Sequence, residues 1–101
     1  MGLIAPNRFE GAPRASVLGV EAKVADRRRL RLLGLMLLPR ERAPSALLIP
    51  RCSAVHTFGM RFPIDVVFVD SDGRAIGSAR GVPPRRLLRW RGASAVLEIP
   101  R

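Results

Sequence analysis

The sequence has one cysteine, Cys52, so the chain cannot form an internal disulfide bond. It also lacks long apolar runs, because the most apolar stretch, 30–39, is interrupted by Arg31 and is too short to span a membrane. The N-terminal residues 1–14 lack the apolar core of a signal peptide. We therefore expect a soluble, cytoplasmic protein with no transmembrane segment.

Acidic residues are scarce, with 8 Asp and Glu against 18 Lys and Arg, which gives a formal net charge of +10. Lys23 is the only lysine, so nearly all of the positive charge is on arginine. Such a field attracts an anionic small molecule, an acidic protein, an anionic lipid surface or nucleic acid. Coding bias in a GC-rich genome explains the arginine preference equally simply. We favour that explanation, because the sequence has no recognisable nucleic-acid-binding module.

The composition favours one β-rich globular domain. The chain has 101 residues, of which 48% are apolar and 26% charged, and nine glycines and nine prolines indicate short elements joined by turns. We predict a mainly β protein, with α+β as the alternative, folded as a small antiparallel sandwich or partly open barrel. Residues 1–14 lack periodicity and are predicted to form a loose leader before a single domain over 15–101.

The apolar pattern predicts strands at 16–26, 46–50, 53–60, 64–69, 74–82 and 93–100, with a short strand or turn at 86–90. One short helix is expected after the first strand, over 27–39, with Asp26 as its N-cap and Gly34 as a point where it could end. The sequence DSDG predicts a hairpin turn before the strand at 74–82. Apolar residues on both faces of 64–69 indicate a strand that is covered on both sides.

Reactive side chains cluster between Cys52 and Asp70, a stretch that holds the only histidine, His56. Cys52, His56 and Asp65 could serve as the nucleophile, base and orienting residue of a hydrolase, although spacing alone does not define such a triad. A cysteine among apolar neighbours is more often an unreactive buried thiol. Zinc would need more soft ligands than the chain offers, so we expect no bound metal or cofactor.

Asp65 interrupts the apolar strand 64–69, where an unpaired carboxylate would be costly, so we expect Arg61 or Arg51 to pair with it. Such a pair is either a structural tie or the wall of an anion pocket. His56 is interpreted either as a proton carrier or polar contact, or as a histidine satisfied within the sheet.

The only tryptophan, Trp90, stands between two arginines, an arrangement found in base-stacking platforms. In a strand, however, alternation would bury Trp90 and expose Arg89 and Arg91. We favour this second interpretation.

Several motifs follow one another in the order of a known prokaryotic family. The sequence HTFGMRFPIDVVFVDSDG, followed by a proline break and AVLEIP, closely resembles the family called domain of unknown function 192, or uncharacterised ACR, over about residues 17–100. The R-x-x-GLM element of that family falls on Arg31, Gly34, Leu35 and Met36. The resemblance implies a compact, mainly β fold with a short helix after the first strand, and it supplies no established activity.

The resemblance also adds candidate site residues. The recurring polar and aromatic positions of the family fall on His56, Phe58, Met60, Pro63, Asp65, Asp70, Gly73, Pro83 and Glu98. From these positions and the local composition, we take as ligand-binding candidates His56, Phe58, Met60, Arg61, Asp65 and Glu98.

The leading hypothesis is a small β-rich domain that binds a small or anionic ligand at a groove around His56 and Asp65. Whether it is an enzyme stays open, since a hydrolase that uses Cys52 or His56 is the alternative. Nonspecific nucleic-acid binding through the arginine clusters 27–31 and 85–91 is a further alternative. An exposed edge strand could also mediate oligomerisation.

Overall fold

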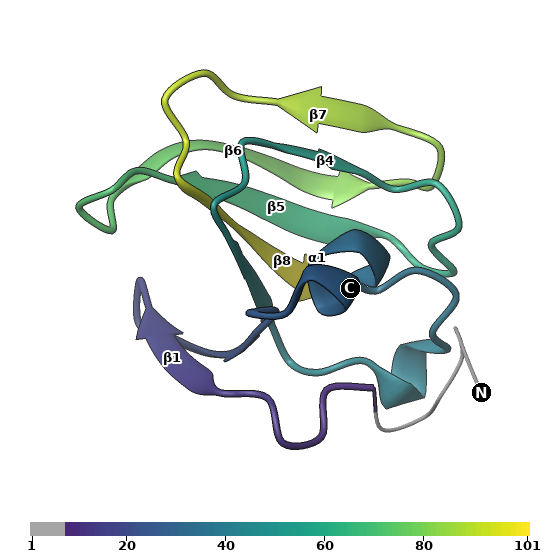
Figure 1. Cartoon of the computed structure of the whole chain (residues 1–101). Helices are drawn as coiled ribbons and strands as arrows, with labels where there is room; N and C mark the ends of the chain where they lie inside the picture. Colours follow the sequence, from purple (N-terminus) through teal and green to yellow (C-terminus); the bar gives the residue numbers. More distant parts are fainter. Residues whose placement is uncertain (1–7) are drawn as a thin grey trace.

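The computed structural model describes residues 8–101, which form a mainly β structure with one short α-helix, as the sequence predicts (Figure 1). A six-stranded open sheet has the order β1-β2-β3-β8-β5-β6, and a two-stranded sheet pairs β4 with β7. The strands are β1 (Arg14–Val17), β2 (Val20–Val24), β3 (Leu47–Pro50), β4 (Ala54–His56), β5 (Ile64–Val69), β6 (Ala75–Val82), β7 (Leu87–Arg89) and β8 (Ala95–Pro100). The helices are α1 (Arg28–Leu33) and the 3-10 helix η1 (Arg40–Arg42).

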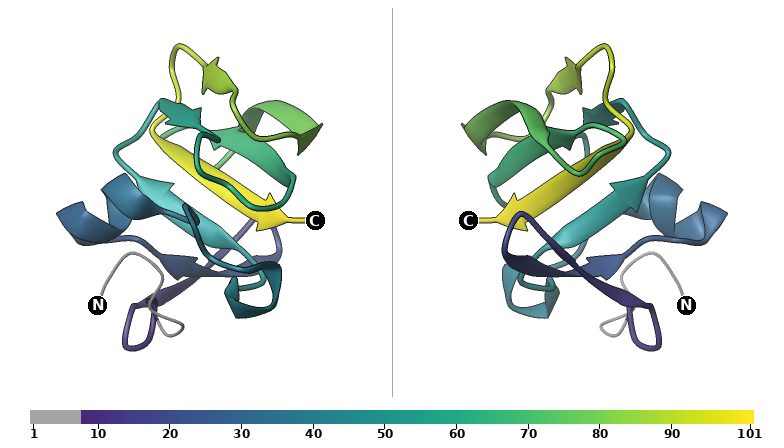
Figure 2. Two further views of the ribbon diagram at one scale, coloured as in Figure 1. Left: turned by 90° about the vertical axis from the view of Figure 1, so that its right-hand side faces the viewer. Right: turned by 90° about the vertical axis from the view of Figure 1, so that its left-hand side faces the viewer.

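One strand pair departs from the predicted antiparallel arrangement, because β2 and β3 are parallel. Parallel neighbours need a crossover connection, and the chain between them carries α1 and η1. This crossover brings α1 to the same side of the larger sheet as β4 (Figures 1 and 2). No helix of residues 8–101 is long and apolar enough to cross a membrane.

The predicted first strand, 16–26, is instead a hairpin of β1 and β2. Leu18 and Gly19 form its tip with φ values of 54° and 77°, the left-handed backbone that a two-residue hairpin turn requires. Leucine rarely adopts this conformation, so the alternating pattern concealed the turn. The hairpin begins at Arg14, within the predicted leader, and Phe9 of the same segment is buried in the core.

The helix α1 is shorter than the predicted range 27–39. Its N-cap residue is Arg27, which makes no side-chain capping bond, so the prediction of Asp26 as N-cap was wrong. The helix ends at Gly34, whose N–H donates to the carbonyl of Leu30 at 2.8 Å. The turn that follows directs Leu35 and Leu38 into the core.

The two faces of β5 are covered unequally. Ile64, Val66 and Phe68 face the main core and are buried. Val67 faces the other side, where a smaller cluster around Ala22 and Leu97 covers it only in part. The prediction of a strand covered on both sides was therefore correct for the main core and only partly so for the opposite face.

Trp90 lies just beyond the end of β7 and is 43% exposed, so the prediction that alternation buries it was wrong. Its ring stacks on the ring of Phe68, with centroids 5.9 Å apart and planes at 26°. The indole lies directly over Gly77 of β6, where a Cβ atom would come within 2.6 Å of three ring atoms. A glycine at this position thus provides the space for the ring.

We expect Gly77→Ala to destabilise the protein by about 1–3 kcal/mol, because the added methyl group must displace the Trp90 ring. Urea unfolding would measure the loss, and the tryptophan emission of the folded variant should move to longer wavelength as the ring becomes more exposed. Ser78→Ala, at the exposed neighbouring position, is the control. Equal unfolding free energies for the two variants would contradict the prediction.

Candidate functional site

A cavity of about 400 Å³ lies between α1, β3, β4 and β8. This volume falls within the usual range of small-molecule pockets. Its lining is mainly apolar with a few polar side chains, and comprises Arg28, Arg31, Leu32, Leu33, Gly34, Ile49, Cys52, Ala54, Val55, His56, Met60 and Glu98.

Glu98 lines this cavity from the central strand β8 and is 1% exposed. Alternation along β8 directs its side chain to the same face as Val96, toward the main core. Its Oε1 atom has no hydrogen-bond partner among residues 8–101, and a Cβ at Gly34 would lie 3.8 Å from it. Burial raises the pKa of this carboxyl from its ordinary value of 4.5 to about 7.

His56 is the last residue of β4 and lines the same cavity. Its Nδ1 atom is buried and finds no hydrogen-bond partner in the described part of the chain. The imidazole ring is tilted at 43° to the ring of Phe58, with centroids 6.0 Å apart.

Arg31 and Arg28 supply the positive charge of the cavity from one side of α1, since residues three apart on a helix are neighbours. Arg31 Nη2 donates to the main-chain oxygen of Arg51 at 3.3 Å, which orients the guanidinium. Its Nε is buried and, within residues 8–101, has no partner.

Arg31 from α1, His56 from β4 and Glu98 from β8 thus line one cavity, and each has a buried polar atom with no partner among residues 8–101: Nε, Nδ1 and Oε1, respectively. A buried polar atom without a hydrogen bond costs free energy, and folded proteins satisfy nearly all of them. The set includes a guanidinium donor, a carboxyl group and an imidazole. Together these groups can bind a small anion that also accepts a hydrogen bond from a protonated carboxyl.

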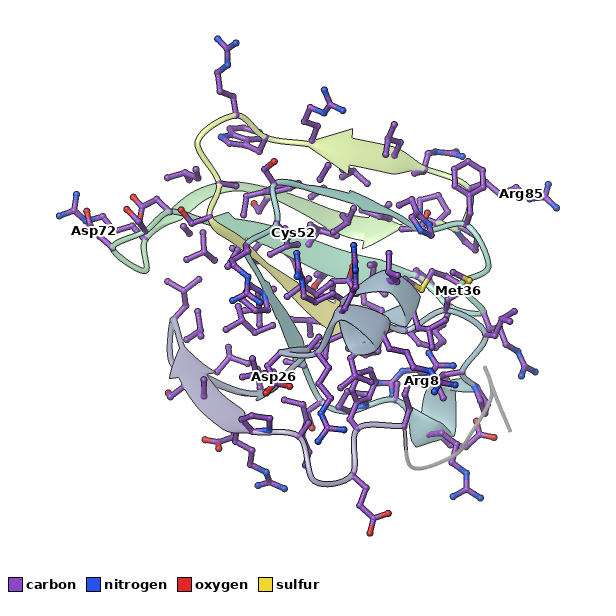
Figure 3. The ribbon with its side chains drawn as sticks, viewed as in Figure 1. Arg8, Asp26, Met36, Cys52, Asp72 and Arg85 are labelled. Atoms are coloured by element: carbon purple, nitrogen blue, oxygen red, sulfur yellow. The ribbon has the colours of Figure 1, made fainter. Side chains whose placement is uncertain are left out.

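Cys52, labelled in Figure 3, also lines the cavity. Its thiol donates a hydrogen bond to the main-chain oxygen of Ala54 at 3.0 Å. The thiol proton is therefore directed to the main chain two residues further on. Among residues 8–101, no three His, Cys, Asp or Glu side chains are grouped closely enough to hold a metal ion.

The structure brings together some of the predicted site residues and separates others. His56, Met60 and Glu98 line the cavity, whereas Phe58 lies beside it with 52% of its surface exposed. Arg61 is exposed and does not contribute to the lining.

Asp65 lies on the face of β5 opposite to the core-facing Ile64 and Val66. Its Oδ1 accepts hydrogen bonds from the Gly81 N–H at 2.7 Å and from Arg101 Nη1 at 3.2 Å. Asp65 therefore has a partner, as expected, but the partner is Arg101.

Sequence reasoning missed Arg28 and Arg31 as site residues. The available signal was the R-x-x-GLM element, which places Arg31 three residues before Gly34. In the structure Arg31 and Gly34 both line the same cavity as Glu98.

The raised pKa of Glu98 predicts a stability that falls with pH. The folded protein keeps this proton up to about pH 7, whereas the unfolded chain releases it near 4.5, so folding takes up a proton between these values. Ionisation therefore removes roughly 3 kcal/mol as pH rises through this window. Glu98→Gln stays neutral, and we expect it to flatten the slope in urea unfolding.

Glu21→Gln, which changes an exposed carboxylate, is the matched control and should keep the wild-type slope. The same pH dependence in the wild type and in Glu98→Gln would show that another group causes it.

Two solved structures share this fold. A protein of unknown function from Novosphingobium aromaticivorans has a TM-score of 0.66 and 22% identity, over 91% of this chain and 84% of that one. A putative transcription regulator from Sinorhizobium meliloti has a TM-score of 0.69 and 22% identity, over 86% of this chain and 77% of that one. At this identity the likeness shows the fold alone. A comparison with curated proteins gave no significant match.

The family resemblance seen in the sequence is confirmed by a direct match to the family model. This match covers residues 12–101, which include every strand and helix of the structure. The chain belongs to the family described as uncharacterised ACR, domain of unknown function 192.

Proposed function

We propose that this protein binds a small anionic ligand with an apolar portion in the cavity between α1, β4 and β8. The observation that carries the proposal is that three residues lining one cavity, Arg31, His56 and Glu98, each have a buried polar atom without a partner in residues 8–101. A ligand that supplies their hydrogen bonds recovers the free energy that their burial costs.

The charge of the cavity favours an anion. Arg28 and Arg31 both line it from α1, and a guanidinium binds carboxylate or phosphate oxygens through paired N–H groups. Arg31 is already oriented through its Nη2 bond to Arg51, so fixing its side chain for the ligand costs less entropy than usual.

The apolar walls favour a hydrocarbon portion next to the anionic group. The apolar part of the lining includes Leu33, Ile49, Val55 and Met60. The apolar surface that these side chains bury against a ligand contributes favourable binding free energy through the hydrophobic effect. Leu32 also lines it but is largely exposed, so it lies at the mouth.

Glu98 makes the binding sensitive to protons. In its neutral form the carboxyl can donate a hydrogen bond to an anionic oxygen, whereas its ionised form repels the same oxygen. Because its pKa is about 7, both forms are present near neutral pH. Binding of an anion therefore takes up a proton and tightens as pH falls.

Nucleophilic catalysis has less support than binding. Cys52 and His56 line one cavity, but the thiol donates its hydrogen bond to the carbonyl of Ala54. A nucleophilic thiol would instead be hydrogen-bonded to the imidazole that activates it. We therefore propose binding and do not assign a reaction.

A thermal-shift series would test the proposal with straight-chain carboxylates from acetate to octanoate and with the matching alkyl phosphates. We expect the melting temperature to rise more with the longer chains, because they bury more apolar surface. Arg31→Gln should weaken binding by roughly tenfold or more, since it removes a charged hydrogen bond. Arg14→Gln removes the same charge from exposed β1 and should bind normally.

Two results would refute this proposal. One is that no member of the series stabilises the protein, and the other is that Arg31→Gln and Arg14→Gln lose binding equally.

The proton linkage gives a second test of the same site. We expect octanoate to bind more tightly at about pH 6 than at about pH 8, because Glu98 must be neutral to donate a hydrogen bond to the carboxylate. Calorimetry in two buffers of different ionisation enthalpy would detect the proton taken up. Glu98→Gln should bind with little pH dependence, and His56→Gln should keep a dependence due to Glu98. Unchanged pH dependence in Glu98→Gln would assign the linkage to another group.

A further inference from the structure

The two-stranded sheet of β4 and β7 carries a surface in which exposed rings alternate with arginines. We define the β4–β7 surface by its exposed residues Phe58, Arg85, Arg86, Leu87, Arg89, Trp90 and Arg91. Trp90 and Arg91 directly follow β7, and the other positions lie on β7 or in the turns beside its start. This surface is separate from the cavity lining, which includes none of these residues.

At one end of the surface, hydrogen bonds through Thr57 place Phe58 beside two arginines. The Thr57 N–H donates to the carbonyl of Arg86 at 2.8 Å, and the Arg85 N–H donates to the carbonyl of Thr57 at 3.3 Å. The buried Thr57 hydroxyl also accepts from the Arg86 N–H at 2.8 Å and donates to the carbonyl of Pro83 at 2.7 Å. The Arg85 side chain extends away from the molecule (Figure 3).

At the other end, Trp90 is fixed with one face of its ring covered. Its main-chain N–H donates to the carbonyl of Ser53 at 3.0 Å, and the ring packs over Gly77 and Phe68. Because 43% of the residue is nevertheless exposed, the opposite face of the ring is open to solvent. Arg89 and Arg91 flank it in the chain and are both exposed.

The positive charge of the β4–β7 surface is not cancelled by acidic residues in the chain segments that contain β4, β6 and β7. Residues 42–64 and 73–97, which contain β4, β6 and β7, include no Asp or Glu. Arginine accounts for all of their charge, so anions are attracted along the whole length of the β4–β7 surface.

From these observations we propose that the β4–β7 surface binds single-stranded nucleic acid. The phosphates contact the four arginines, and unpaired bases stack on the open face of Trp90 and on Phe58, as in other single-strand-binding surfaces. Arg86 and Trp90 are four residues apart, so the two ends are separated by roughly 13 Å of extended chain.

Two features favour a single strand over an acidic protein or a duplex. A flat ring with one free face, flanked in the chain by two exposed arginines, matches an unstacked base, which a duplex does not present. An acidic peptide would use the arginines but would leave the open face of Trp90 without a matching partner.

The intrinsic fluorescence of the protein offers a direct readout, because Trp90 is the only tryptophan and the chain has no tyrosine. We expect oligothymidylate of about 12 nucleotides to quench this emission on binding to the full chain. With four phosphate contacts, the affinity should fall roughly 50-fold as salt rises from about 50 to about 200 mM. Fluorescence anisotropy of a labelled oligothymidylate would measure the affinity of each variant.

The variants separate stacking from general charge. Phe58→Ala and Trp90→Leu should each weaken binding by roughly tenfold, with circular dichroism to verify that they fold. Arg89→Gln/Arg91→Gln should weaken it strongly, whereas Arg14→Gln/Arg42→Gln removes the same charge from exposed positions on β1 and η1 and should not.

Three outcomes would overturn the proposal. The first is the absence of oligonucleotide binding at low salt, including a result in which only polyglutamate binds. The second is binding without quenching of Trp90, with inorganic polyphosphate bound as tightly as the oligonucleotide. The third is equal weakening by the two double-arginine variants.

Discussion

The position of β8 between β3 and β5 is the constraint on which the cavity depends. Both neighbours pair with β8 in antiparallel register, so the orientation of every β8 side chain is fixed by two ladders. Glu98 lies opposite Leu47 on one side and Val66 on the other, and it therefore points into the main core face. A one-residue shift would move the carboxyl to the other face and replace it with an apolar side chain, which would remove the cavity's titratable group.

Local sequence signals predicted the elements in which neighbouring residues determine the structure. The DSDG turn and the hairpin of β5 and β6 follow from a short turn motif between apolar strands, and Asp70 accepts the Arg74 N–H within that turn at 2.9 Å. The turn at Leu18 was not predictable, because leucine carries no preference for the left-handed backbone. Asp26 has the chemistry of an N-cap, yet the helix starts one residue too late for it to cap.

Long-range contacts were beyond local reasoning. The partner of Asp65 is 36 residues away, and only the pairing of β5 with β8 brings Arg101 next to it. Trp90 escapes the β7 alternation because it lies beyond the end of that strand, and its ring packs over Gly77 of another strand. The grouping of His56 with Glu98 was indicated by the family resemblance, whereas Arg31 joined them only through the crossover that carries α1.

The parallel join of β2 and β3 has a mechanical consequence for the cavity. This join includes only two paired positions, Lys23 with Leu47 and Val24 with Leu48, whereas β8 pairs with β5 along its full length. Local stability in a protein follows such differences, so segments held by few hydrogen bonds open at lower free energy than the core. Arg28 and Arg31 are on α1, which follows the weakly paired strand β2. Glu98 is on β8, which is paired on both sides. We therefore expect amide hydrogen exchange to be graded across the cavity, faster at its arginine side and slower at its carboxyl side.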